Sequence, residues 1–180
     1  MTIFTIGHST RAFDTLVAAL KSAGADCVAD VRRFPHSRRH PQFNAEALAR
    51  ALPEVGVLYC PMPELGGRRT RQSEGISSNT LWREAAFRNY ADYAETAEFR
   101  AALASLIALG REHTVAIMCA EAVWWRCHRR IIADYLIAAG ESVVHILDVG
   151  KTEPARLTEG AALRGDGSIR YAAAQSSLPL

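Results

Sequence analysis

The chain has 180 residues, 49% of them apolar, which is enough to bury the core of one domain, and its net charge of +2 does not by itself indicate a nucleic-acid partner. No run of about 18 apolar residues occurs, and the first residues lack the charged start and apolar stretch of a signal peptide, so we expect neither a membrane span nor export. Four cysteines without a disulfide spacing pattern indicate reduced thiols and a cytoplasmic protein.

Apolar runs and helical periodicity alternate along the first 150 residues. The β-rich runs predict strands at residues 2–6, 25–31, 55–59, 115–118 and 142–147. Apolar residues at steps of three and four predict helices at residues 13–20, 45–52, 81–93, 94–109 and 127–139, with Gly110 ending the fourth. Alternating strands and helices form parallel βαβ units. We therefore expect an α/β domain over residues 1–150, in three layers, with a mostly parallel five-stranded sheet and helices on both faces.

Residues 151–180 are expected to form a small extension, packed on this domain or trailing from it. Gly165-Asp166-Gly167 predicts the turn of a hairpin between residues 162–164 and 168–171. The last nine residues carry no pattern and are expected to be loose. The polar stretch 68–79 has no periodicity either, so we expect a mobile surface loop or lid.

Polar and titratable residues follow, or lie near, the ends of all five predicted strands. In chain order they are His8 and Ser9; Asp30, Arg32 and Arg33; Glu64; Cys119 and Glu121; and His145 and Asp148. Because the carboxyl ends of parallel strands meet at one edge of a sheet, and open α/β sheets bind ligands there, we expect a binding or active site at this edge.

Five short motifs connect the chain to a known family. They are GHST after the first strand, DVRRFP with a downstream QFN, the PELGG turn, MCAE and CHR. Together they resemble the family catalogued as domain of unknown function 488, over most of the chain. The resemblance implies an α/β domain and no settled biochemical activity. It marks these motif positions: His8, Asp30, Arg32, Glu64, Cys119, Glu121, Cys127, His128 and Arg129.

Cys119 is the candidate nucleophile. It ends a buried strand near a helix N-terminus, where the helix dipole together with Arg126 and Arg129 would lower the pKa of its thiol. The alternative is a small apolar residue that closes the strand, as most buried cysteines do. Six residues separate Cys119 from Arg126, one more than a phosphatase-type loop has, so we do not predict a phosphatase.

Glu121 and His128 each allow two interpretations. Glu121 could act as a general base, or its carboxylate could hold Arg129 in a bidentate ion pair. His128 lies on or beside the buried stripe of its helix. It is therefore either a general acid or base, or a structural histidine whose partner is Glu121 or Asp30.

The sequence predicts no metal ion and no organic cofactor. Cys119, Cys127 and His128 could bind zinc only with a fourth ligand such as His8, and paired Cys-x-x-Cys knuckles are missing. A glycine-rich dinucleotide fingerprint and a phosphate-cradling lysine loop are also missing, so NAD and ATP are not expected.

Arginine outnumbers lysine by 19 to 2, and ten arginines lie in loops that are predicted to share the carboxyl edge. Arginine suits phosphate and carboxylate, and Phe34, Phe43, Trp124 and Trp125 between them could stack on a base. The alternative is a solvated basic surface with both phenylalanines in the core. The ten arginines are Arg32, Arg33, Arg38, Arg39, Arg68, Arg69, Arg71, Arg126, Arg129 and Arg130.

These observations favour an enzyme, a cofactor-independent transferase or hydrolase with a reactive cysteine, that acts on an anionic, phosphate-bearing nucleotide or nucleic acid. The catalytic candidates are Cys119, Glu121, His128, Asp30 and His8. The substrate-binding candidates are Arg32, Arg33, Glu64, Cys127, Arg129 and Trp124. The alternative function is a non-enzymatic nucleic-acid-binding module, whose arginines would bind backbone phosphates with a steep dependence on salt.

Overall fold

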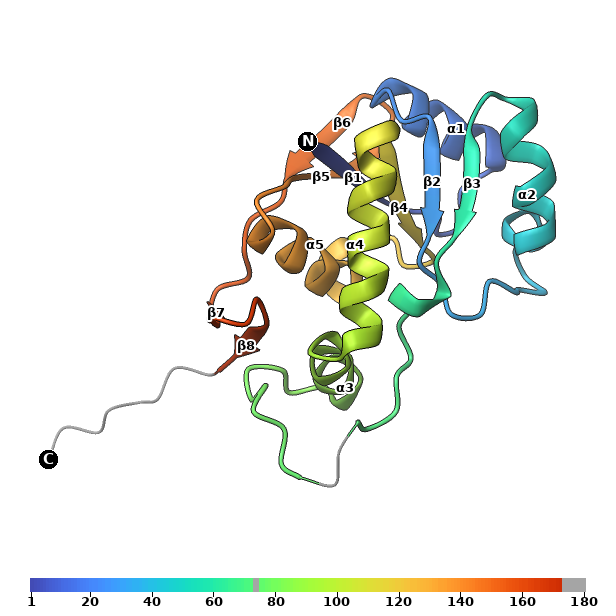
Figure 1. The fold of residues 1–180 in the computed structure, drawn as a ribbon. Coiled ribbons are helices and arrows are strands. Elements are labelled where there is room, and N and C mark those ends of the chain that lie inside the picture. The colour runs from blue at the N-terminus through green and yellow to red at the C-terminus, as the bar shows by residue number, and fades with distance from the viewer. Residues whose placement is uncertain (73–74, 173–180) are drawn as a thin grey trace, which may run out of the picture.

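Six strands form one sheet in the order β3-β2-β4-β1-β5-β6 (Figure 1). The computed structural model describes residues 1–72 and 75–172. The strands of the sheet are β1 (Thr2–Gly7), β2 (Cys27–Asp30), β3 (Leu58–Pro61), β4 (Val115–Cys119), β5 (Ser142–Asp148) and β6 (Lys151–Pro154). The first five are parallel, and β6 pairs antiparallel with β5. The carboxyl ends of β2, β4 and β1 therefore lie side by side at one edge.

Helices cover both faces of the sheet, which gives three layers (Figure 1). One face packs against α1 (Phe13–Ser22) and α2 (Ala45–Glu54). The core on the other face includes side chains of α3 (Ala85–Ala94), α4 (Ala97–Glu112) and α5 (Arg129–Ala138). Three single-turn 3₁₀ helices interrupt the loops, at Pro41–Phe43, Pro63–Leu65 and Trp124–Arg126.

Strand alternation decides which core each side chain joins. In β4, Ile117 and Cys119 pack with α3, α4 and α5, whereas Ala116 and Met118 pack with α1 and α2. All residues of β4 are buried, because helices cover both faces of the sheet. The same alternation in β1 and β2 divides the polar residues at the carboxyl edge between two faces.

The predicted fold class is confirmed: an α/β fold with a mostly parallel sheet, helices on both faces and a small C-terminal hairpin. The sheet has six strands rather than five because β6 adds to it. All four residues of β6 are exposed, and they include a lysine and a proline, which are typical of an edge strand. Such a strand has no alternating apolar pattern, so the periodicity of the sequence did not indicate it.

Two of the predicted boundaries that were wrong lie at or beside a glycine. Gly110 does not end α4, which continues to Glu112. A Cβ atom at Gly110 would lie 2.7 Å from Cε of Met1, so the glycine lets Met1 pack against the helix. Gly56 has a φ of +77° and follows α2, so β3 begins at Leu58, three residues later than predicted.

The hairpin pairs β7 (Ala161–Leu163) with β8 (Ile169–Tyr171), as predicted. Ile169 and Tyr171 are fully buried, and the Tyr171 hydroxyl donates to Asp134 of α5 at 2.9 Å. Residues 173–180, which make up most of the tail that was expected to be loose, lie outside the described residues, as do residues 73–74 of the predicted lid. The mobility of residues 68–79 stays a prediction. Within the described ranges, no helix has both the length and the apolarity needed to cross a bilayer.

Candidate active site

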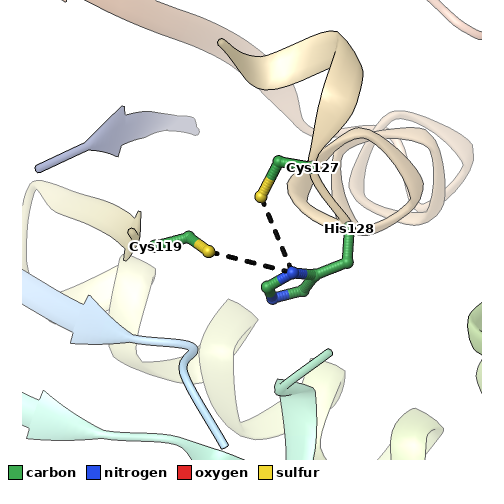
Figure 2. Close-up of side chains that lie close together, drawn as sticks. All are labelled: Cys119, Cys127 and His128. Atoms are coloured by element: carbon green, nitrogen blue, oxygen red, sulfur yellow. Dashed lines mark hydrogen bonds between the residues drawn. The ribbon is translucent and has the colours of Figure 1, made fainter. Parts of the chain in front are cut away.

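Two sulfur atoms and one imidazole nitrogen meet at the carboxyl end of β4 (Figure 2). We call Cys119, Cys127 and His128 the Cys–Cys–His cluster. Cys119 is the last residue of β4, and Cys127 and His128 immediately precede α5. The Sγ atoms of Cys119 and Cys127 lie 3.9 Å and 3.6 Å from His128 Nδ1, and all three atoms lie within 4.8 Å of one another. The predicted convergence of these three residues is therefore present.

The orientation of the His128 ring is set by the main chain. Its Nε2 lies 2.9 Å from the carbonyl oxygen of Val31. A carbonyl can only accept, so Nε2 donates its proton to Val31, and this bond turns Nδ1 toward the two sulfurs. The partner of His128 is thus Val31, and the sequence-based choice of Glu121 or Asp30 was wrong.

The two thiols of the cluster have opposite shifts of pKa. The hydrogen bond to Cys127 and then burial raise the pKa of Cys119 well above its ordinary value. Burial also acts to raise the pKa of Cys127, but the hydrogen bond from Cys119 and the neighbouring His128 and Arg129 outweigh it and hold that pKa well below its ordinary value. Of the two thiols, Cys127 therefore has the lower pKa, whereas the sequence predicted a lowered pKa for Cys119.

Arg129 holds the cluster and the preceding turn together. Its side chain is buried, 1% exposed, and its Nε donates to Cys127 Sγ at 3.3 Å. Its Nη2 donates at 2.6 Å to the main-chain carbonyl oxygen of Glu121, so the predicted pair with the Glu121 carboxylate is not formed. Arg129 is therefore a buried support of the cluster, and the substrate-binding role suggested by the sequence stays a prediction.

A second polar network lies on the other face of the sheet. The Arg32 guanidinium donates to both carboxylate oxygens of Asp30, with Nε to Oδ1 at 2.7 Å and Nη2 to Oδ2 at 2.5 Å. Tyr59 also donates to this carboxylate, at 2.7 Å. Asp30 is 1% exposed and Arg32 9%. Asp30, predicted to be catalytic, thus belongs to a buried ion pair.

His8 joins this network instead of the sulfur atoms. Its Nε2 lies 3.1 Å from Nη1 of Arg32, and its Nδ1 lies 3.0 Å from the Ser9 carbonyl, which can only accept. The ring stacks on Phe43, a core residue on the α1 and α2 face. Burial and then the charge of Arg32 lower the pKa of His8 to about 4. The imidazole is therefore neutral, with both nitrogens engaged, and cannot be the fourth metal ligand that the sequence suggested.

A cavity of about 160 Å³ opens beside the cluster. We call it the arginine cavity, because three arginines from two loops line it together with Cys119 and His128. The full lining is Arg32, Arg33, Phe34, Gly67, Arg68, Cys119, Ala120, Glu121 and His128. The arrangement places the Cys119 sulfur and an imidazole beside a cationic rim, which suits an anionic ligand.

Two residues of this rim were not among the catalytic or substrate-binding candidates, although Arg68 is one of the ten arginines predicted at this edge. Gly67 packs on the His128 ring so closely that a Cβ atom would lie 2.8 Å from Nδ1. Arg68 follows it with a φ of +57°, in the left-handed region that few non-glycine residues adopt. Strained residues of this kind gather at functional sites. The signals in the sequence were the PELGG motif, which ends at Gly67, and the cluster of arginines that begins at Arg68.

Two further cavities adjoin the first. One, of about 200 Å³, shares Arg68, Glu121 and His128 with it and reaches Cys127 and Arg126. The other, of about 610 Å³, is lined by aromatic residues together with Glu121 and Arg126. We call it the tryptophan cavity, and its aromatic residues are Trp82, Phe87 and Trp125. Glu121, exposed and in the lining of all three cavities, is positioned to reach a ligand in any of them.

The remaining predicted site residues lie elsewhere. Glu64 is exposed, and the contacts of that residue are made by its main-chain carbonyl, which accepts from Tyr93 at 2.6 Å and from Arg69 at 2.7 Å. Trp124 stacks on His145, with ring centroids 4.3 Å apart. Its neighbour Trp125, 48% exposed, is the tryptophan that faces a cavity.

His145 provides a test of the packing behind the site. Burial and then the charge of Arg129 lower the pKa of His145 from 6.5 to about 4. Between these two values the unfolded chain binds more protons than the folded chain. The contribution of His145 to the free energy of unfolding is therefore complete above pH 6.5 and is lost as the pH falls toward 4. His145→Asn, which keeps a polar group near Thr5, should reduce the slope of unfolding free energy against pH by about 1.4 kcal/mol per pH unit in this interval.

Urea unfolding at a series of pH values measures this slope for both proteins. Above neutral pH the difference between them should not depend on pH, which serves as the internal control. Parallel curves over the whole acidic range would contradict the burial of a neutral His145.

A family model described as "Domain of unknown function DUF488" matches residues 12–136, which is more than half of the 180-residue chain. The match includes the Asp30–Arg32 pair and the whole Cys–Cys–His cluster, and it begins after His8. Comparison with curated proteins found no match, and comparison with solved structures found none. The family suggested by the five motifs is thereby confirmed: the chain belongs to the family described as Domain of unknown function DUF488.

Proposed function

We propose that this protein is an enzyme that acts on a phosphate-bearing substrate, with the phosphate in the arginine cavity and the reacting group against the Cys–Cys–His cluster. The observation that carries the proposal is the lining of one small cavity by Cys119 and His128 together with Arg32, Arg33 and Arg68. An anion held by the arginines would lie against the sulfur and imidazole atoms.

The arginines differ in how many donors they can offer. Arg32 already donates to Asp30, to the Phe43 carbonyl and, through Nη1, to His8 Nε2. It therefore contributes a fixed positive charge more than free hydrogen bonds. Arg33 is exposed and donates one bond, at 3.1 Å, to the carbonyl of Arg68. Arg33 and Arg68 are therefore the residues expected to bind the phosphate directly.

A nucleotide is the phosphate-bearing class that the neighbouring surface favours. The tryptophan cavity is reached from the arginine cavity past Glu121, and Trp125 offers it a half-exposed indole face. Bases stack on such faces with little dependence on sequence. The phosphate would bind at the arginines and the base at the indole.

The test combines binding and turnover. Nucleoside 5′-monophosphates, sugar phosphates and short single-stranded RNA are incubated with the protein, and products are followed by phosphorus NMR. We expect turnover of at least one class. Arg68→Ser should weaken substrate binding by about 10- to 100-fold, the usual loss for a hydrogen bond to a charged group. Arg50→Ser, which removes an exposed arginine of α2 far from the cavity lining, is the matched control and should change nothing.

Other outcomes of the same test would contradict the proposed enzyme or its site. Binding without turnover, with an affinity that falls steeply with salt and is unaffected by Cys119→Ser, would indicate the non-enzymatic nucleic-acid-binding module. If Arg50→Ser and Arg68→Ser weaken binding equally, the arginine cavity is not the site.

A further inference from the structure

The Cys–Cys–His cluster has the dimensions of a metal site. Zinc binds thiolate sulfur at about 2.3 Å and imidazole nitrogen at about 2.0–2.1 Å, so ligand atoms at the corners of a tetrahedron are roughly 3.5–3.8 Å apart. The two sulfur-to-nitrogen distances in the cluster are 3.9 Å and 3.6 Å, and the largest separation is within 4.8 Å. The two sulfur-to-nitrogen distances are thus close to those of a tetrahedron, and the three side chains point toward one another (Figure 2).

The atoms that surround the cluster also suit a metal. His128 directs Nδ1 into the cluster while Nε2 donates to the Val31 carbonyl at 2.9 Å, and metal-binding histidines are usually held in this way by their second nitrogen. Arg129 Nε donates to Cys127 Sγ, an N–H···S bond that stabilises a thiolate. Two thiolates and an imidazole are soft and borderline ligands, which select zinc over magnesium or calcium.

We propose that Cys119, Cys127 and His128 bind one zinc ion whose fourth position opens to the arginine cavity. The inference deepens the proposed function, on which it rests for its substrate class, by naming a cofactor that the sequence did not predict. In the part of the chain that the structure describes, the cluster contains only these three ligand residues. His8, once the candidate for the fourth, is engaged with Ser9 and Arg32.

The charge balance around the proposed zinc ion indicates which kind of group would occupy the fourth position. Zinc, with a charge of +2, neutralises two thiolates, and any proton still on a thiol leaves to solvent on binding. The buried Arg129 then leaves one net positive charge. Among residues 1–72 and 75–172, no carboxylate forms a salt bridge with Arg129. An anion at the open position completes the balance, since an uncompensated buried charge is costly. A phosphate oxygen from the arginine cavity meets this requirement.

The experiment begins with the full chain, purified under reducing conditions without chelator. We expect about one zinc per chain by mass spectrometry. After chelation, titration with Co²⁺ should produce a sulfur-to-cobalt charge-transfer band. Cys119→Ser and Cys127→Ser should each lower metal affinity by at least about 100-fold, more than the loss that supporting residues cause. Cys60→Ser, at a half-buried cysteine outside the cluster, is the matched control and should bind cobalt as the wild type does.

A readout on the wild-type protein removes any dependence on the folding of the variants. Two of the four thiols should react with a disulfide reagent only after zinc is removed. Inorganic phosphate should then change the visible spectrum of the cobalt protein, more weakly in Arg68→Ser. Equal thiol reactivity with and without chelation, or cobalt binding without a charge-transfer band, would overturn the zinc site.

The metal site and the proposed function fail in different ways. If no metal binds but a phosphate ester is still turned over and Cys119→Ser abolishes the reaction, the zinc inference is wrong and the function stands on a thiol. If zinc binds with the expected ligands but no phosphate compound changes the cobalt spectrum or is turned over, the metal site stands and the proposed function is wrong.

Discussion

Replacing Asp30 by alanine should lower the free energy of unfolding by about 3–5 kcal/mol, the loss found when one partner of a buried ion pair is removed. The Arg32 guanidinium would keep its charge, because arginine does not lose its proton in proteins. It would also remain almost fully buried, since Asp30 and Arg32 are 1% and 9% exposed. The Tyr59 hydroxyl would lose its acceptor at the same time.

Urea unfolding measures the loss of stability in Asp30→Ala, and two further variants are compared with it. Glu46→Ala breaks the pair between His36 and Glu46, whose side chains are 74% and 71% exposed, and should leave the midpoint unchanged. The double variant Asp30→Ala/Arg32→Met should be more stable than Asp30→Ala alone, because it removes the uncompensated charge. A loss below about 1 kcal/mol in Asp30→Ala would contradict the buried pair.

Gly7→Ala should cost about 3 kcal/mol or more, at or above the upper end of the range for overpacking. A Cβ atom there would lie 1.8 Å from the main-chain oxygen of Glu121 and 2.9 Å from Nη2 of Arg129. Relief requires a shift of the backbone rather than of a flexible side chain. The Glu121 carbonyl is itself held by Arg129 at 2.6 Å, so the shift would disturb the arginine that supports Cys127.

The control is Gly165→Ala in the turn of the hairpin, where an added Cβ meets nothing within 4 Å. Its urea midpoint should stay that of the wild type. We expect Gly7→Ala to lose both stability and metal binding by the cobalt assay. Equal midpoints for the two variants would mean that β1 does not pack against the turn after β4 as described.

Much of the fold followed from local patterns. The apolar run of β4 predicted a buried strand, and helical periodicity after it predicted α5, because strands and helices in an α/β fold differ in period. The parallel arrangement then placed Cys119, Glu121 and Arg32 at one edge. What the periodicity could not show was β6, whose exposed residues have no apolar side to reveal a strand.

The site was predicted less completely, since its composition depends on which face of the sheet each side chain joins. Asp30 and His8 were grouped with Cys119, because all three are at the ends of neighbouring strands. Alternation sends Cys119 to the α5 side and the other two to the side of Phe43. Strand periodicity is visible in one strand at a time, but the faces of different strands match only after the strands are paired.

The sequence alone determined that this chain is an α/β protein with polar and titratable residues at the carboxyl edge of its sheet, because hydrophobic period and strand–helix alternation are local properties. Only the tertiary structure decided that Cys119, Cys127 and His128 form one cluster while Asp30, Arg32 and His8 form another. That division depends on distances of a few ångströms between elements far apart in the chain. It also depends on main-chain partners such as the Val31 carbonyl, which cannot be predicted from the residue type.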